Sequence, residues 1–146
     1  MSYDPGIDAT KMSDARTALI CARFHLRGGK RRLQKGRTAA GMVALYDSIL
    51  FGMHYYLTIH ERCASFLESI EPWDAMSMFQ ALTRAGVFAD PLTFNRFSLI
   101  VERTLWQGSS AFDANAVLTQ VEEMLATLGV MPFSAGPPRR KPARSD

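Results

Sequence analysis

The amino-acid sequence predicts an all-α protein, a four- or five-helix up-and-down bundle whose long second helix lies at its centre. Apolar residues recur three and four positions apart along most of the 146 residues, which is the periodicity of amphipathic helices. Glycine, proline and capping residues interrupt this pattern at short intervals, so consecutive helices are expected to run antiparallel. No segment alternates apolar and polar residues between hairpin turns, and a sheet is therefore not expected.

The first two helices are expected to form a hairpin. Ser13 and Asp14 are suitable capping residues, and the first helix is expected over residues 13–27, ended by the Gly28-Gly29 pair. The second helix follows a basic segment and runs from Arg37 to Ile70, because the next proline cannot continue it.

Three shorter helices follow the hairpin, and each has a recognisable end. Aspartate is a good helix cap, proline suits the first helical position, and glycine commonly ends a helix. The expected helices are 73–85 before Gly86, a helix from Asp90-Pro91 to Gln107, and a helix between Asp113 and Gly129.

Composition and organisation indicate one domain with two terminal segments. Apolar residues make up 47% of the chain and charged residues 21%, as in an ordinary globular protein. Residues 1–12 are expected to be an N-terminal extension and 13–133 the helical bundle domain. Residues 134–146 combine prolines with four bases and no apolar cluster, so a disordered basic tail is expected.

Several classes of protein are excluded by the residues that are scarce. Two cysteines, Cys21 and Cys63, exclude a disulfide scaffold and suit a reducing compartment. The most apolar stretch, residues 42–59, is interrupted by Asp47 and His54 and does not suit a membrane span. The first eleven residues lack the apolar core of a signal peptide. We therefore expect a cytoplasmic protein that does not enter a membrane.

Positive charge is concentrated in one segment. The formal net charge is +3, yet residues 16–37 contain eight Lys and Arg and no acid, whereas residues 38–138 contain four Arg and ten acids. This density predicts contact with an acidic protein partner or nucleic acid. Aromatic interleaving, which favours single-strand stacking, is limited to Phe24. The alternative is a solvated connection whose charges pair with the acidic remainder. The candidate contact residues are Arg27, Lys30, Arg31, Arg32, Lys35 and Arg37.

Large apolar residues of the second helix suggest a homodimer. Tyr46, Met53 and Tyr56 add to an apolar surface that is wider than a single helix seam buries in a small monomer. Either the helix is central in its own bundle, or a second chain covers these three residues.

Potential metal ligands occur in two separated pairs. Cys21 and His25 are four residues apart, and His60 and Cys63 are three apart, spacings that suit zinc. In the expected hairpin the two pairs lie at opposite ends, roughly 35 Å apart at ~1.5 Å per residue. We therefore expect no metal and no cofactor.

Catalytic motifs are also not apparent. Asp47, His54, Glu61 and Glu68 recur every seven residues, about 10.5 Å apart along a helix, so no two can share an ion or a proton. We expect these four residues to face solvent. Phosphate-binding glycine loops and nucleophile-elbow motifs do not occur, and no catalytic residue is predicted.

Two segments resemble the HEPN helical-bundle superfamily. Residues 36–47 are similar to the glycine-containing turn and Ala-rich helix near the start of that fold, and residues 81–90 to a later connection. The resemblance, over about residues 13–107, implies a bundle that dimerises and acts through protein or nucleic-acid contacts. HEPN nucleases carry an Arg followed after four to six residues by His on a late helix, and neither Arg96 nor Arg103 is followed by one. We expect a non-catalytic interaction module; the alternatives are a degenerate HEPN-like nuclease, another nucleic-acid-binding protein or a bundle metalloenzyme.

Overall fold

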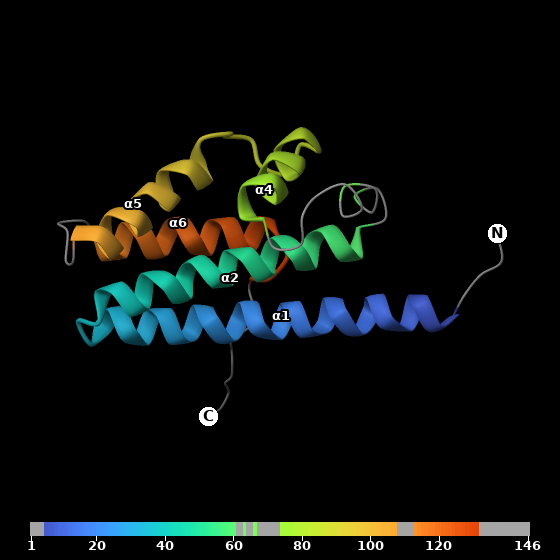
Figure 1. The fold of residues 1–146 in the computed structure, drawn as a ribbon, viewed down its shortest axis with the longest axis horizontal. Coiled ribbons are helices and arrows are strands. Elements are labelled where there is room, and N and C mark those ends of the chain that lie inside the picture. The colour runs from blue at the N-terminus through green and yellow to red at the C-terminus, as the bar shows by residue number, and fades with distance from the viewer. Residues whose placement is uncertain (1–4, 61–62, 64–65, 67–73, 108–112, 132–146) are drawn as a thin grey trace, which may run out of the picture.

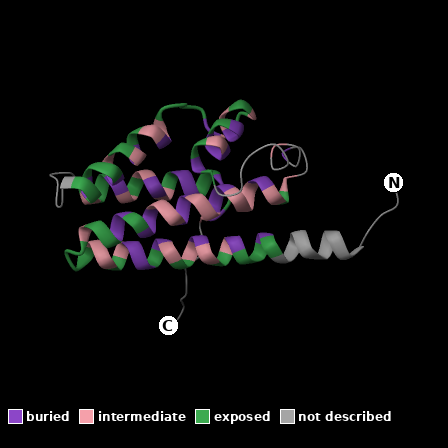
Figure 2. Ribbon diagram, viewed as in Figure 1, coloured by how far each residue is buried: buried purple, intermediate pink, exposed green. Residues whose placement is uncertain are grey.

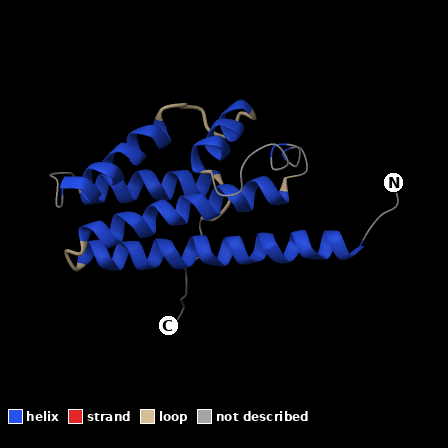
Figure 3. Cartoon of the chain, in the orientation of Figure 1, coloured by secondary structure: helices blue, strands red, loops and turns tan. Residues whose placement is uncertain are grey.

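The computed structural model describes residues 5–60, 63, 66, 74–107 and 113–131, with side chains from Asp14 onward. These residues form helices and no strand, so the all-α prediction is confirmed (Figures 1 and 3). The helices are α1 Pro5–Gln34, α2 Thr38–Ile59, α4 Ala75–Arg84, α5 Thr93–Gln107 and α6 Ala114–Thr127. Among them, none combines the length and apolar composition that crossing a bilayer requires.

The first helix is longer at both ends than the sequence pattern predicts. It begins at Pro5, so the expected start at residue 13 is wrong; proline suits a first helical turn because its missing N–H needs no partner there. It also passes through Gly28-Gly29 and ends at Gln34, and the turn is made at Gly36, whose φ is 77°.

Gly29 of α1 and Gly41 of α2 serve the packing of these two helices. The two helices run antiparallel and side by side (Figure 1). A Cβ on Gly29 would lie 3.1 Å from the carbonyl oxygen of Gly41, and one on Gly41 would lie 3.1 Å from the amide nitrogen of Leu33. Near the middle of the hairpin, the buried Ser48 hydroxyl donates to the Ala22 carbonyl oxygen at 2.7 Å. Small residues thus let the two backbones approach closely.

The second helix ends at Ile59, so the expected extension to Ile70 is wrong. His60 has extended backbone angles and its ring stacks on Tyr56 at 3.8 Å. The Cys63 amide donates to the His60 carbonyl oxygen at 2.8 Å, which turns the chain and buries Cys63 completely. A straight continuation would have carried Cys63 away from the core that covers it.

Local capping sets the ends of the three shorter helices much as predicted. The Asp74 carboxylate accepts from Ser77 at the start of α4, and that of Asp113 accepts from two amides at the start of α6. Gly86 and Gly129 have φ of 81° and 82° after the helices end. The Asp90 carboxylate accepts from the amide of Leu92, and α5 begins at the residue after that. Trp73 and the tail 134–146 lie outside the described residues.

The core lies around α2, which contacts α1, α4, α5 and α6 (Figure 2). Its largest fully buried side chains include Phe79, Phe94 and Phe97. A Cβ on Gly52 would lie 3.0 Å from the Leu125 side chain, so α6 packs directly on the α2 backbone. The chain after α6 returns to α1, where Arg23 Nε donates to the carbonyl oxygen of Val130 at 3.1 Å.

Candidate anion-binding surface

The structure places the six predicted contact residues at one end of the hairpin. Four lie in the last turns of α1 and two in the connection to α2, and all but two are exposed. The exposed residues are Arg27, Arg31, Lys35 and Arg37. The sequence-predicted cluster is therefore a real cluster in space.

The other two residues are only partly exposed. Lys30 Nζ lies 3.1 Å from Glu122 Oε2 on α6, and this half-exposed ion pair joins the first helix to the last. Arg32 lies over Gly28, with Nη1 only 2.7 Å from where a Cβ would stand. The charge of Lys30 is therefore partly neutralised within the chain, by Glu122.

Because α1 continues through both glycines, the cluster extends into a longer stripe. Residues three or four positions apart share one side of a helix. The stripe consists of Arg16, Ile20, Phe24, Arg27 and Arg31 of α1, together with Lys35 directly after its last residue. All are exposed, and we call the stripe the α1 outer face. Ending the first helix at residue 27 had hidden this continuity, which the same helical spacing across Gly28-Gly29 could have revealed.

The ring of Phe24 contacts His25, which in turn contacts Phe51 of α2. The Phe24 ring meets His25 edge-on, with centroids 5.5 Å apart and an interplanar angle of 77°. His25 in turn stacks on Phe51 of α2, at 5.4 Å and 8°. Even so, 60% of Phe24 is exposed. The outer face thus presents an oriented aromatic ring among cations.

One flank of the hairpin brings acids and histidines together. A cavity of about 280 Å³ is lined by Asp14 and Thr17 of α1 and by Phe51 and His54 of α2. Burial lowers the pKa of His54, and the Asp14 carboxylate opposes this effect. Burial also raises the pKa of Asp47, and nearby His25 opposes that change.

The prediction that the four acids and histidines seven residues apart face solvent is therefore wrong for two of them. Asp47 and His54 are half-buried beside α1. The spacing of residues along α2 does not show which of its sides is covered by α1. Glu61 and Glu68 lie outside the described residues.

The two cysteine–histidine pairs are nearer than predicted. Because α1 continues to Gln34, His25 lies opposite Phe51 of α2. Phe51 is only nine residues before His60, which corresponds to about 13.5 Å along the helix axis. Within the described ranges, no three His, Cys, Asp or Glu side chains gather closely enough to hold a metal ion.

The predicted dimer residues lie largely in the chain's own core. Met53 is completely buried, so its assignment to a dimer surface is wrong. Tyr46 packs on Phe94 at 5.8 Å, and burial raises its pKa. Tyr56 stacks on His60. The central position of α2 is what buries these large side chains.

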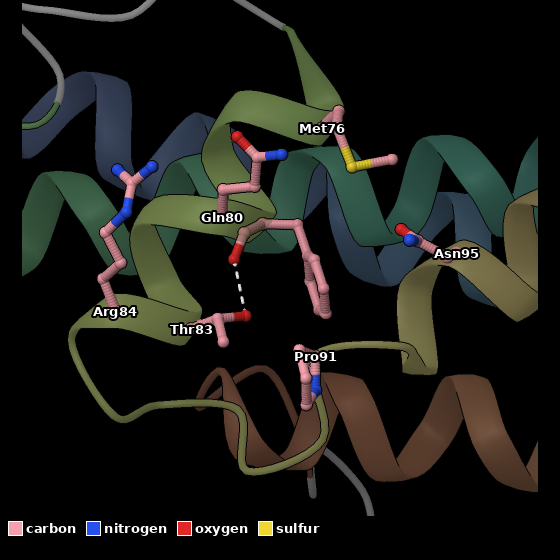
Figure 4. A pocket seen from close by; sticks show the side chains of 7 residues that line it. Met76, Gln80, Thr83, Arg84, Pro91 and Asn95 are labelled. Atoms are coloured by element: carbon pink, nitrogen blue, oxygen red, sulfur yellow. Dashed lines mark hydrogen bonds between the residues drawn. The ribbon is translucent and has the colours of Figure 1, made fainter.

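A second cavity, of about 330 Å³, lies between α4 and α5 (Figure 4). The Thr83 hydroxyl beside it donates to the Phe79 carbonyl oxygen at 2.9 Å. Asn95 Oδ1 is buried without a hydrogen-bond partner among the described residues. Gln80, Arg84 and this acceptor give the cavity polar lining groups, and Met76 and Pro91 are among its apolar ones.

Comparisons of the chain with protein-family models, with curated proteins and with solved structures found no match. The chemistry of the surfaces is therefore what indicates function.

Proposed function

We propose that this chain is a non-catalytic binding module that holds an acidic partner on the α1 outer face. One observation carries the proposal: Arg27, Arg31 and Lys35 lie about one turn apart on a single helix face, Arg16 lies about three turns before them on the same face, and all four are exposed in a segment that contains no acid. Cations at this density create a local potential that attracts phosphates or carboxylates. The acidic residues of the chain are concentrated in later elements.

The proposed setting is the cytoplasm, with the protein as a homodimer. Free Cys21 and Cys63 support a reducing compartment. A dimer surface is supported where α2 meets α5, since Val43 and Leu105 are exposed there around a groove of about 260 Å³, and Trp106 is 85% exposed nearby. Light scattering tests it: Trp106→Glu should convert a dimer to monomer, and a monomeric wild type contradicts it. HEPN-like ancestry remains a proposal supported by the all-helical fold.

Charge reversal with a matched control tests the binding function. In the full chain, Arg27→Glu/Arg31→Glu changes the α1 outer face, whereas Arg84→Glu/Arg103→Glu makes the same change in net charge on exposed arginines of α4 and α5. Fluorescence anisotropy measures the affinity for a labelled polyglutamate and a labelled oligonucleotide.

The α1 variant should bind at least one probe about tenfold or more weakly than wild type, and the control variant within about twofold of it. Equal losses in both variants contradict the proposal, because they would trace binding to net charge and not to this face.

A further inference from the structure

Apolar side chains occupy the middle of the α1 outer face. Ile20 and Phe24 are 58% and 60% exposed, with Arg16 one turn before them and Arg27 one turn after. A partner that supplied negative charge alone would leave both apolar side chains in water. The partner that suits this face combines negative charge with a surface that can cover them.

The ring of Phe24 is suited to stacking. Its edge-on contact with His25, which itself stacks on Phe51, fixes the ring relative to the hairpin. A pre-oriented ring loses little side-chain freedom when a flat partner covers it. Every nucleobase offers such a flat surface, irrespective of sequence.

We propose that the α1 outer face binds single-stranded nucleic acid, with one base stacked on Phe24 and the neighbouring phosphates bound by Arg16, Arg27, Arg31 and Lys35. This inference rests on the proposed function, the binding of an acidic partner by the same face, and assigns the class of that partner. One guanidinium group can donate two parallel hydrogen bonds to the oxygens of a phosphate. The three arginines of the face are therefore suited to binding phosphates.

The dimensions of the face suit a short length of strand. From Arg16 to Lys35 the helix axis extends about 28 Å, and neighbouring positions on the face lie about one turn, or ~5.4 Å, apart. Cations stand on both sides of Phe24 along the axis. A strand that runs along α1 can therefore place a base on the ring and phosphates before and after it.

A double helix suits the face less well. Its bases are stacked inside, so its outer surface would offer phosphates to the cations and nothing to Ile20 or Phe24. Entry into a major groove requires a protruding helix. The helix α1 does not protrude in this way, because α2 covers it along one side, Arg23 binds the Val130 carbonyl oxygen and Lys30 binds Glu122 of α6.

The test compares probes and variants of Phe24 in the full chain. The probes are labelled deoxyuridine and uridine oligonucleotides of about ten nucleotides, a duplex of that length, a labelled polyglutamate and anionic phospholipid vesicles. Both single strands should bind more tightly than the other probes, and the two together show whether the 2′-hydroxyl contributes.

Phe24→Ala should weaken single-strand binding by about tenfold and leave polyglutamate binding unchanged. Phe24→Trp should retain the affinity, and the oligonucleotide should quench its fluorescence more than that of wild type. Because Phe24 is exposed, circular dichroism should show the same melting temperature for both variants within a few degrees.

Two kinds of result overturn this inference and leave the proposed function in place. One is equal affinity for duplex and single strand, or no loss in Phe24→Ala. The other is a preference for polyglutamate or for vesicles. Failure of every probe to bind overturns both the inference and the proposed function.

Discussion

Alanine at Gly29 is expected to destabilise the fold, whereas alanine at the adjoining Gly28 is expected to stabilise it. Both glycines lie inside α1, where alanine is favoured over glycine by about 1 kcal/mol. They differ in what a new Cβ would meet. The pair therefore tests the close approach of α1 and α2 while holding helix propensity constant.

The expected magnitudes follow from the neighbours. A Cβ on Gly29 would lie 2.8 Å from Leu45 Cδ2 and 3.1 Å from the carbonyl oxygen of Gly41, a fully buried side chain and a backbone atom. Overpacking of this kind costs about 1–3 kcal/mol. A Cβ on Gly28 meets the end of the flexible Arg32 side chain. After the helix-propensity gain, the two variants should differ in stability by about 2 kcal/mol.

Urea denaturation monitored by circular dichroism measures this difference directly. The denaturation midpoint should fall for Gly29→Ala and rise for Gly28→Ala, with unchanged dependence on urea concentration. If the Gly29 variant is as stable as the Gly28 variant, the close approach of α1 and α2 at Gly29 is refuted.

Three further predictions concern charged and titratable groups. Asp47→Asn should raise the melting temperature at pH 7 and change it little near pH 3, because burial raises the carboxyl pKa in the fold and ionisation above pH 3.8 therefore destabilises it; a lower melting temperature at pH 7 would contradict this. His54 has a pKa lowered from 6.5, so its contribution to stability is present above pH 6.5 and is lost as pH falls; His54→Gln should show a smaller decrease in stability than wild type between about pH 7.5 and 5.5. A double-mutant cycle of Lys30→Met and Glu122→Gln should give a coupling of about 0.5 kcal/mol, since the pair is half-exposed; strictly additive effects would show that the pair does not form.

The sequence alone predicts a helix end correctly where that end depends on local chemistry. Asp113 accepts hydrogen bonds from the next residues, and Gly86 and Gly129 adopt positive φ for the same local reasons that made them recognisable. These features need no information about the rest of the chain.

The sequence alone does not predict a helix end that depends on packing against a neighbouring helix. Gly28-Gly29 could equally end a helix or lie in one against a partner, and only the position of Gly41 decides between the two. The end of α2 is set in the same way, by the burial of Cys63 after the turn at His60.

The candidate surface was predicted in part. The basic cluster near residues 27–37 follows from charge counting, since no fold changes which residues are charged. The exposure of Ile20 and Phe24, by contrast, depends on which side of α1 is covered by α2. The assignment of Met53 to a dimer surface is wrong because the apolar pattern of α2 does not show what covers it. A partner chain and the chain's own helices require the same apolar residues.

The salt dependence of oligonucleotide binding tests the central role of the α1 outer face most directly. For a single strand, the logarithm of affinity falls with the logarithm of salt concentration with a slope of about −0.7 per phosphate contact. Four contacts predict a slope near −3 for wild type, reduced in magnitude by about 1.4 in Arg27→Glu/Arg31→Glu and unchanged in Arg84→Glu/Arg103→Glu. An identical slope in all three proteins would contradict the assignment of binding to this face.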